Sequence, residues 1–238
     1  MLDTDEINRF GKMLSERSDQ TAQRIYTEAG EEFNINSPKQ LGEILFGKLG
    51  MKGGKKTKTG YSTKAEILEK LRNDNPIVQD VLDYRTYSKL KSTYCDGLVS
   101  LVDPDTHRIH SIFNQTGTVT GRLSSSEPNM QNIPTRTELG RELRKMFVAE
   151  EGYMLIDADY SQIELRVLAH LSHDETMIDA FVKDADIHAV TASKILGIPP
   201  ENLTKEQRNS AKAINFGIVY GMSEYTLSQD LNIPFKQA

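Results

Sequence analysis

The first hundred residues show an alternation of apolar and polar positions that is typical of amphipathic helices. The spacing predicts one helix over residues 3–30 and another over residues 76–94. Capping boxes at residues 37–40 and 63–66, in which a hydroxyl and a Gln or Glu satisfy free backbone N–H groups, predict two shorter helices. The apolar faces of the two longer helices consist of Ile7, Phe10, Leu14 and Ile25, and of Val78, Val81, Leu82 and Leu90.

Beyond residue 102 the spacing of the apolar residues changes. Residues 107–120 are rich in Ile, Thr and Val and predict short strands, whereas residues 124–134, which contain two prolines, predict a loop. An apolar run over residues 153–159 predicts a buried strand, and helical spacing returns from Ser161 onwards. The order of a helical arm, a mixed segment and a helical segment indicates an α+β fold.

Composition and charge narrow the class of protein. The 238 residues are 37% apolar and 26% charged, which excludes collagen-like, mucin-like and wholly disordered chains. No apolar run approaches the roughly 18 residues of a membrane span, and the single cysteine, Cys95, excludes an internal disulfide. We therefore expect one large domain or two small ones, in a soluble and reducing compartment. The net charge of −5 argues against a histone-like coat on nucleic acid but is compatible with a local basic cleft.

Asp159 stands directly after the predicted strand and just ahead of the predicted helix. A carboxylate at the end of a strand, facing the start of a helix, is suited to Mg²⁺, which prefers hard oxygen ligands. The alternative is that Asp159 caps the helix. Asp157 lies on the same face of the strand, because strand side chains alternate, and we expect it to be a peripheral surface acid.

A second candidate site lies in residues 204–221, where a capping box predicts the start of a helix over about residues 205–220. Residues four apart differ by only about 40° around a helix, so one stripe of side chains combines two cations with two aromatic rings. Such cations suit a triphosphate, and the rings offer a base a stacking surface. The alternative is an amphipathic helix with solvated charges and partly buried rings. The stripe consists of Arg208, Lys212, Phe216 and Tyr220, and the opposite, packed face of Ala211, Ile214 and Ile218.

Two polar segments fit contacts with nucleic acid. Residues 116–134 carry Arg122, Asn129 and Gln131 on irregular backbone, where such groups reach sugars, phosphates and minor-groove acceptors. Residues 48–64 contain six lysines and no acid, which suits a basic tip that touches a phosphate backbone. A solvated surface loop is the alternative for both segments. The lysines that we expect to contact DNA are Lys55, Lys56 and Lys58.

Three stretches together resemble the motifs of family A DNA polymerases of the bacterial DNA polymerase I type. DYSQIELR, at residues 159–166, resembles motif A, and RNSAKAINFGIVYG, at residues 208–221, resembles motif B, the fingers helix that meets the incoming nucleotide. TGRLSSSEPNMQNIP, at residues 120–134, resembles the loop that lies along primer and template. Their order and family-like spacing make the set far more specific than any one motif. The resemblance covers nearly the whole chain and implies template-directed DNA synthesis with Mg²⁺ and deoxynucleoside triphosphates.

The resemblance assigns roles in metal and phosphate binding. Asp159 would hold both Mg²⁺ ions of a two-metal reaction, helped by the backbone carbonyl of Tyr160. Arg208 and Lys212 would grip the triphosphate, and Lys212 would protonate the leaving pyrophosphate. His188 matches a further phosphate contact.

The resemblance also assigns contacts with the nucleotide and with DNA. Phe216 would stack on the sugar and base, and a Phe rather than a Tyr there implies discrimination against dideoxynucleotides. Glu164, oriented by Tyr220, would exclude a ribose 2′-OH. The other matching positions are Gln162 and Arg136 near the nucleotide, and Arg122, Asn129 and Gln131 near the primer end and the minor groove.

The same resemblance implies a domain organisation. Residues 1–105 would form part of a helical thumb with a basic tip at 48–64, residues 106–165 part of an antiparallel palm, and residues 166–238 part of the fingers. The expected partners are primer-template DNA and deoxynucleoside triphosphates. The expected location is the cytoplasm of a bacterium or of a cell infected by phage, in association with the nucleoid.

The sequence departs from the family pattern in one respect. We find no motif C, a His-Asp-Glu turn between apolar strands that supplies the second metal carboxylate. The letters occur at residues 173–175, but without flanking apolar strands, so we expect Asp174 to cap a helix over residues 177–181. We therefore expect an N-terminal portion of a polymerase domain that is inactive alone. Two alternatives stay open: a module that binds primer-template DNA or a nucleotide without chemistry, and one half of a split polymerase completed by a C-terminal fragment.

Overall fold

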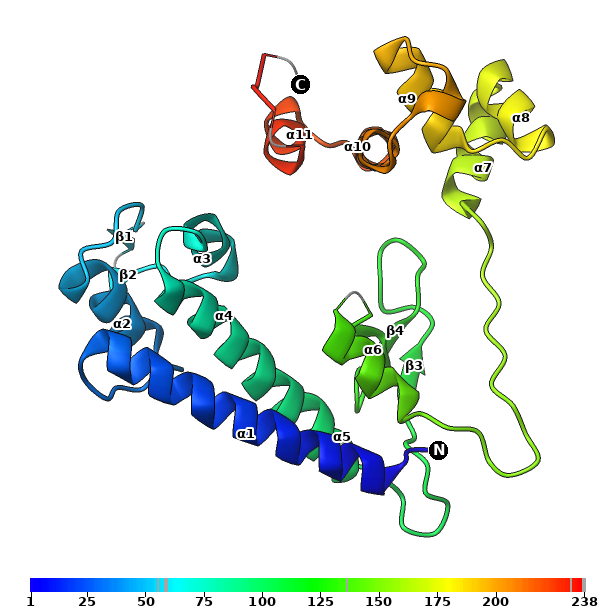
Figure 1. Ribbon diagram of the computed structural model, residues 1–238. Helices are drawn as coiled ribbons and strands as arrows, with labels where there is room; N and C mark the ends of the chain where they lie inside the picture. Colours follow the sequence, from blue (N-terminus) through cyan, green and yellow to red (C-terminus); the bar gives the residue numbers. More distant parts are fainter. Residues whose placement is uncertain (55, 58–59, 136, 232, 237–238) are drawn as a thin grey trace. The chain divides into compact units, whose positions relative to one another are not determined.

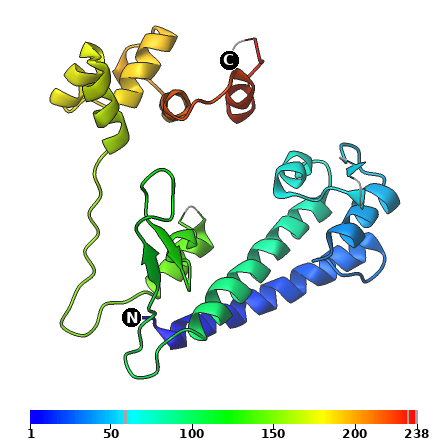
Figure 2. The same ribbon diagram turned by 180° about the vertical axis from the view of Figure 1, so that it is seen from behind.

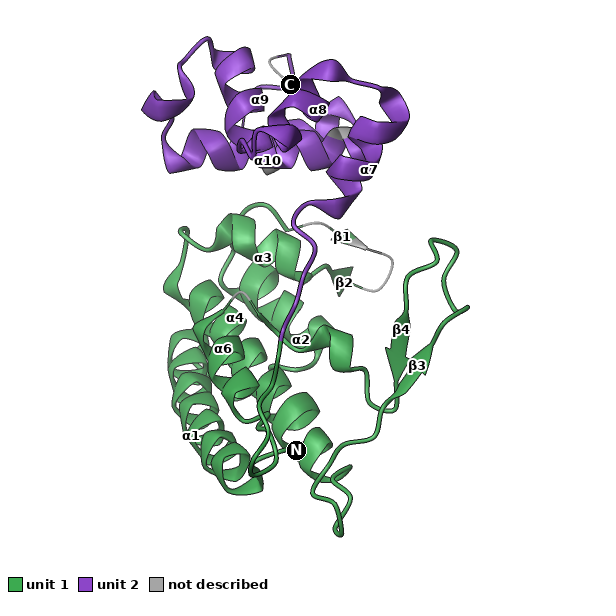
Figure 3. Cartoon of the chain, turned by 90° about the vertical axis from the view of Figure 1, so that its right-hand side faces the viewer, with its two compact units in different colours: residues 1–156 green, residues 157–238 purple. Residues whose placement is uncertain are grey.

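The computed structural model describes residues 1–238 except 55, 58–59, 136, 232 and 237–238. Contacts within the chain divide it into unit 1, residues 1–156, and unit 2, residues 157–238, which Figure 3 shows in different colours. Helices predominate, and the strands of the described residues form two small antiparallel pairs, which confirms the predicted α+β class. Among these residues, no helix combines the length and the apolar character that a membrane crossing requires.

Two long helices lie side by side in unit 1, as Figures 1 and 2 show from opposite sides. Helix α1 (Thr4–Ala29) begins after Asp3, whose carboxylate accepts a hydrogen bond from the N–H of Glu6 at 2.9 Å. The helix ends at Gly30, which adopts the left-handed conformation (φ 73°) that glycine takes most readily. The helix predicted over residues 3–30 is confirmed.

Helix α4 (Pro76–Lys89) is the second member of this pair. It begins with a proline, directly after Asn75, whose side-chain oxygen accepts a hydrogen bond from the N–H of Ile77 at 3.1 Å. The helical path continues through a π-helix, η2 (Leu90–Asp96), into α5 (Gly97–Val99). The predicted start is confirmed, and the path extends beyond the predicted end.

Short elements form the tip of this helical pair. The capping box predicted at residues 37–40 is confirmed only in part. The Ser37 hydroxyl accepts a hydrogen bond from the N–H of Gln40 at 3.4 Å, but the side chain of Gln40 accepts from the N–H of Asn34 at 2.7 Å. The capping box predicted at residues 63–66 is wrong, since Arg85 donates to the Thr63 hydroxyl at 3.1 Å and the following helix begins without a side-chain cap. The elements of the tip are α2 (Pro38–Gly42), the π-helix η1 (Glu43–Lys48), β1 (Lys56–Thr57), β2 (Gly60–Tyr61) and α3 (Ala65–Leu71).

Two apolar clusters make up the core of unit 1. One lies at the tip, and the other joins the opposite end of the helical pair to α6 (Glu138–Lys145). The predicted apolar faces are buried except at Leu82, which is half-buried. The fully buried side chains are Ile25, Ile35, Leu41, Leu45, Leu68, Ile77, Val78 and Val81 in the tip cluster, and Ile7, Leu14 and Leu143 in the other.

A small antiparallel sheet follows the helical pair. Strand β3 (Ile112–Asn114) pairs with β4 (Ser124–Ser126), and the 3₁₀-helix η3 (Met130–Asn132) comes next. Within the described residues of 107–120, where short strands were predicted, the strand that forms is β3, which pairs with β4. The loop predicted over residues 124–134 is interrupted by β4 and η3. The strand was missed because a run of serines carries no alternation of apolar and polar residues.

The buried strand predicted over residues 153–159 is also wrong. This stretch has neither helix nor strand, and Tyr153, Met154, Leu155 and Ile156 are between 69% and 83% exposed. A strand requires a neighbour for its backbone hydrogen bonds, and no described segment pairs with this one. The apolar run is therefore extended and open to solvent.

Unit 2 consists of short helices around a small core. Asp174 accepts a hydrogen bond from the N–H of Met177 at 2.8 Å, so it caps a helix as predicted. The buried core consists of Leu165, Ala180 and Ile187. The helices are α7 (Ile163–Ser172), α8 (Glu175–Val182), α9 (Ile187–Leu196), η4 (Pro200–Asn202), α10 (Lys205–Val219) and α11 (Glu224–Asp230).

Candidate functional site

Helix α10 carries the predicted stripe of cations and aromatic rings. Its capping box is reciprocal: the N–H of Thr204 donates to the side chain of Gln207 at 2.9 Å, and the N–H of Gln207 donates to the Thr204 hydroxyl at 3.2 Å. Ala211 is buried on the opposite side, whereas Lys212 is exposed. The helix is therefore as predicted, and its orientation is confirmed at these two positions. Ile214 of the predicted packed face is half-buried, and the side chain of Ile218 lies outside the part of the chain that the structure describes.

Arg208, the first cation of the stripe, is paired with Asp186 at the start of α9. Its Nε donates to the Asp186 carboxylate, which also accepts hydrogen bonds from the N–H of His188 at 3.0 Å and of Ala189 at 3.3 Å. Burial opposes the ionisation of Asp186, but these donors outweigh it and hold the pKa of the carboxyl below its usual value. Asp186 is thus a charged cap that joins α9 to α10.

His188 lies in the first turn of α9, two residues after Asp186, and is only 2% exposed. Its Nδ1 is 3.0 Å from the amide nitrogen of Asn215, which can only donate, so Nδ1 accepts and Nε2 carries the proton. Burial lowers the pKa of His188, and the neighbouring cations Arg208 and Lys212 lower it further against the opposing effect of Asp186. His188 therefore favours the neutral form.

The two aromatic residues of the stripe form one stacking surface. The rings of Phe216 and Tyr220 are nearly parallel, at 11°, with centroids 6.2 Å apart, and the His188 ring lies 5.8 Å from Phe216. The Tyr220 hydroxyl donates to Glu164 on α7 at 2.9 Å. The orientation of Glu164 by Tyr220 is the contact that the resemblance implied, while the role of Glu164 in sugar selection stays a prediction.

The motif A residues that precede α7 make fewer contacts than the residues of α9 and α10 described above. Asp159 and Tyr160 are exposed and lie on irregular backbone, and Gln162, at the helix start, has φ 54°. Because Gln162 occupies the N-cap position of α7, the alternative that Asp159 caps this helix is wrong. The side-chain oxygen of Gln162 is shielded from solvent and has no hydrogen-bond partner among the described residues.

The donors at this site suit Mg²⁺ in kind but do not form a complete coordination shell. Asp159 offers a carboxylate and Tyr160 a carbonyl oxygen, both hard ligands, and Mg²⁺ usually combines one or two carboxylates with waters and substrate phosphates. The described part of the chain contains no group of three His, Cys, Asp or Glu side chains placed to hold a metal. These two oxygens therefore fit a metal that substrate phosphates help to bind.

The predicted DNA contacts belong to unit 1. Asn129 caps η3 by accepting a hydrogen bond from the N–H of Gln131 at 3.0 Å, and the Gln131 amide donates to the carbonyl of Leu123 at 3.2 Å. Arg122 is exposed on the same loop, and Lys56 lies 5.6 Å from the centre of the Tyr61 ring. Their roles stay predictions. The predicted contacts Lys55, Lys58 and Arg136 lie outside the described residues.

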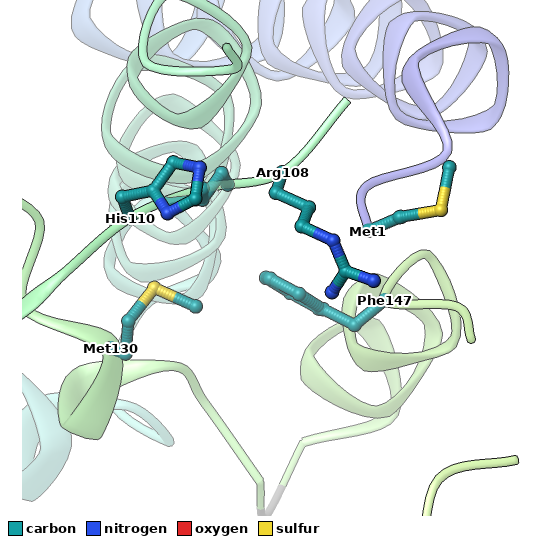
Figure 4. Close-up of a pocket in the computed structure, with 6 residues that line it drawn as sticks. Met1, Arg108, His110, Met130 and Phe147 are labelled. Carbon is teal, nitrogen blue, oxygen red and sulfur yellow. The ribbon is translucent and has the colours of Figure 1, made fainter. Parts of the chain in front are cut away.

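A cavity of about 310 Å³ in unit 1 contains none of the predicted site residues. Figure 4 shows Met1, Arg108, His110, Met130 and Phe147 around it. The amino terminus of Met1 donates to a backbone carbonyl at 2.9 Å, and Arg108 forms an ion pair with Glu150 at 2.7 Å. The first contact fastens the start of the chain, and the second joins two later segments of unit 1. Because no predicted site residue lines this cavity, the candidate chemistry remains with the polar contacts of unit 2.

Sequence reasoning missed two members of this site, Asp186 and Asn215. Asp186 stands before a helix with the spacing of an N-cap, which is the only signal in the sequence for its position. No sequence pattern indicated that it also pairs with Arg208, or that Asn215 contacts His188, because both contacts depend on how α9 packs against α10.

Comparison with known proteins agrees with the motifs. The sequence profile of DNA polymerase family A matches residues 4–238. The chain belongs to DNA polymerase family A. It is 52% identical over 238 residues to DNA polymerase I of Bacillus subtilis and 54% identical over 216 residues to the thermostable DNA polymerase I of Thermus aquaticus. These matches cover 100% and 90% of this chain, but only 27% and 26% of those polymerases.

A solved structure supports the same assignment for the fold. The polymerase domain of Pol1 from M. smegmatis, in complex with DNA primer-template and dNTP, matches with a TM-score of 0.89 at 42% identity. The match covers 100% of this chain and 42% of that one. The chain thus spans about a quarter of the length of the family A polymerases named above.

Proposed function

We propose that this chain supplies the nucleotide-binding part of a DNA polymerase of the DNA polymerase I type, in DNA replication or repair. In such an enzyme, a primer 3′-OH attacks the α-phosphorus of a deoxynucleoside triphosphate that is paired with the template. The observation that carries the proposal is the α9–α10 arrangement, which places a paired guanidinium and a buried imidazole beside two stacked rings.

Each group of this arrangement has a distinct task in the proposal. The guanidinium of Arg208 and the ammonium of Lys212 bind the triphosphate oxygens, and Lys212 supplies the proton for the leaving pyrophosphate. Phe216 and Tyr220 present a flat surface to the sugar and base. Glu164 accepts a hydrogen bond from the Tyr220 hydroxyl, and its task in the proposal is to exclude a ribose 2′-OH.

Magnesium belongs to the same proposal. Asp159 and the carbonyl oxygen of Tyr160 are the ligands that this chain would contribute, as hard oxygens on an accessible segment. Bound Mg²⁺ would stabilise the charge that develops on the attacking and leaving oxygens. The remaining ligands would come from phosphates, water and other carboxylates.

Primer-template DNA is the proposed macromolecular partner. The relative from M. smegmatis is described in complex with DNA primer-template and dNTP, and this chain aligns with it over its whole length. Arg122, Asn129 and Gln131 lie on one loop of unit 1, which suits contacts with the primer end and the minor groove. The lysines of residues 48–64 suit the phosphate backbone.

We further propose that the 238-residue chain alone binds nucleotide but does not extend a primer. Asp159 lies in an exposed irregular stretch, and catalysis requires its carboxylate to be held within a fraction of an ångström. The two alternatives predicted from the sequence stay open beside this proposal, because Asp174 caps a helix and does not belong to a motif C turn. One is a module that binds primer-template DNA or a nucleotide without chemistry, and the other is one half of a split polymerase that a C-terminal fragment completes.

Nucleotide binding is the direct test of this function. Arg208→Ala should weaken binding of a deoxynucleoside triphosphate with Mg²⁺ about 10- to 100-fold, because hydrogen bonds to charged groups contribute about 1.5–3 kcal/mol. The matched control is Lys183→Ala, which removes a cation that is also paired with an aspartate, at 2.8 Å, but on α8. Isothermal titration calorimetry measures both. Equal binding by the wild type and Arg208→Ala would contradict the proposed site.

Primer extension then separates the alternatives. The purified chain is incubated with Mg²⁺, primer-template DNA and four deoxynucleotides, with Asp159→Ala as a control for contaminating polymerase. We expect no extension by the chain alone. Extension that appears when a C-terminal fragment of the Bacillus subtilis relative is added would indicate a split enzyme. Extension by the wild-type chain alone that disappears in Asp159→Ala would overturn the proposal of inactivity.

A further inference from the structure

The Asp186 carboxylate is the one acidic group that the described contacts place against the cations of the stripe. It accepts from Arg208 Nε and from two backbone N–H groups of α9 at the same time. A carboxylate beside a triphosphate site repels the ligand. Its presence there therefore indicates a second role that outweighs this repulsion. The geometry of the pair indicates what that role is.

Among the described residues, the hydrogen bonds of the Arg208 side chain involve Nε alone, so its two Nη groups take no part in the pair. A guanidinium binds phosphate best through two parallel N–H groups, and it has five N–H donors in a rigid plane. Fixing Nε on one side therefore fixes the direction in which the Nη groups point. The Arg208 side chain is 40% exposed, so these groups can reach a ligand from solvent.

The carboxylate itself is held in place. Its bonds to the N–H groups of His188 and Ala189 fix it to the first turn of α9, and the His188 ring is joined to Asn215 on α10. Arg208 and Asn215 are seven residues apart, about two helical turns, so α9 meets one side of α10 at two points. Asp186 is therefore a rigid support for Arg208.

We propose that Asp186 is a positioning residue for the incoming nucleotide: it holds Arg208 through Nε and thereby orients the Nη edge toward the triphosphate. This inference rests on the proposed function and adds a residue to it. Asp186 touches no substrate and exerts its effect through Arg208. Its negative charge costs some attraction for the ligand, and the fixed direction of the guanidinium outweighs that cost.

Two substitutions separate this role from helix capping. Asp186→Asn keeps a good N-cap but removes the charge that holds Arg208, whereas Asp186→Glu keeps the charge but is a poor cap. Asp186→Asn should therefore weaken binding of dATP with Mg²⁺ about tenfold with little change in melting temperature, and Asp186→Glu should bind more tightly than Asp186→Asn but melt at a lower temperature. A merely structural role predicts that binding and melting temperature change in the same order.

The matched control is Asp174→Asn. Asp174 caps α8 by accepting a hydrogen bond from the N–H of Met177 at 2.8 Å, and no described contact joins it to a cation. Asp174→Asn therefore removes the same charge from a helix cap without affecting an ion pair. Its binding constant should equal that of the wild type. Inorganic triphosphate, used as a second probe in the same titrations, should show the same order of affinities, because the effect concerns phosphate and not the base.

A double-mutant cycle gives the decisive outcome. In the Arg208→Ala background, Asp186→Asn should have no further effect on dATP binding, because the group that it orients is absent. Unchanged or tighter binding by Asp186→Asn alone would overturn the positioning role while leaving the proposed function intact. Binding that is unaffected by Arg208→Ala would overturn both, so the two failures are distinguishable.

Discussion

Units 1 and 2 hold their helices together by different means. In unit 1, two apolar clusters lie along the long helices α1 and α4, and most side chains in these clusters are almost fully buried. In the described part of unit 2, the apolar core consists of Leu165, Ala180 and Ile187, and polar contacts join the helices. These contacts are Asp186 with Arg208, His188 with Asn215, and Glu164 with Tyr220. Each of these polar pairs in unit 2 thus includes a side chain that is proposed to act at the nucleotide, whereas the apolar clusters of unit 1 consist of residues without a chemical task.

The largest expected effect is the loss of a buried leucine in unit 1. Leu14→Ala should lower the free energy of unfolding of unit 1 by about 3 kcal/mol, because it removes apolar contacts and leaves a cavity in a well-packed core. The same substitution in unit 2, Leu165→Ala, should cost less, since fewer neighbours surround the site. Urea unfolding measures both, with hydrogen exchange to assign the loss to a unit.

An exposed leucine provides the control for this pair. Leu171 on α7 is 71% exposed, and Leu171→Ala should change the free energy of unfolding by less than about 0.5 kcal/mol. The comparison between the units would fail if Leu165→Ala cost as much as Leu14→Ala. In that case the small core of unit 2 would be as important as the clusters of unit 1.

A smaller effect in unit 2 is expected from pH. Burial lowers the pKa of His188 below its ordinary value of 6.5, so at acidic pH the unfolded chain takes up a proton more readily than the folded one. The stability of unit 2 should therefore be complete above about pH 6.5 and decrease as the pH falls below that value. His188→Gln should reduce this dependence in calorimetric melts between pH 8 and 5.5. Parallel pH profiles of wild type and His188→Gln would contradict the assignment.

The smallest expected effect compares two guanidinium–carboxylate pairs. Arg24 on α1 and Asp80 on α4 lie 2.6 Å apart in unit 1, and Arg24 is more than half exposed. Asp80→Asn should cost about 1 kcal/mol, because solvent reaches the Arg24 end of the pair, although the Asp80 side chain is only 13% exposed, and because the apolar clusters hold the same helices together. Thermal melts at low and high salt check this, since the difference should shrink as salt is added. Asp186→Asn in unit 2 is the matched substitution, and we expect little change in melting temperature from it as well. A loss of much more than about 1 kcal/mol for Asp80→Asn would contradict the expectation.

The sequence predicted most helices because each has a local signal. Apolar spacing indicated α1 and α4, and the capping box at Thr204 with Gln207 indicated the start of α10. The failures concern residues whose state depends on distant partners. The run from Tyr153 to Ile156 is apolar enough for a strand, but no described segment pairs with it, and Thr63 forms a hydrogen bond with Arg85 in place of capping α3.

The candidate site shows the same division. Arg208, Phe216 and Tyr220 share a helix face, so helical geometry alone predicted that they lie together. Asp186 and Asn215 join the site only through the packing of α9 on α10, which local patterns do not contain. Family motifs identified Glu164 as a neighbour of Tyr220, and its hydrogen bond at 2.9 Å agrees with that prediction.

The length of α1 gives unit 1 the properties of a lever. With 26 residues, the helix extends for about 39 Å at about 1.5 Å per residue, from the cluster that includes Leu143 of α6 to the tip that carries Lys56. A tilt of about 10° at the α6 end would move the far end by about 7 Å, roughly twice the rise of about 3.4 Å per base along a DNA strand. Small changes in packing at the base, such as a shortened side chain at Leu143, are therefore amplified into large changes in where the lysines can reach.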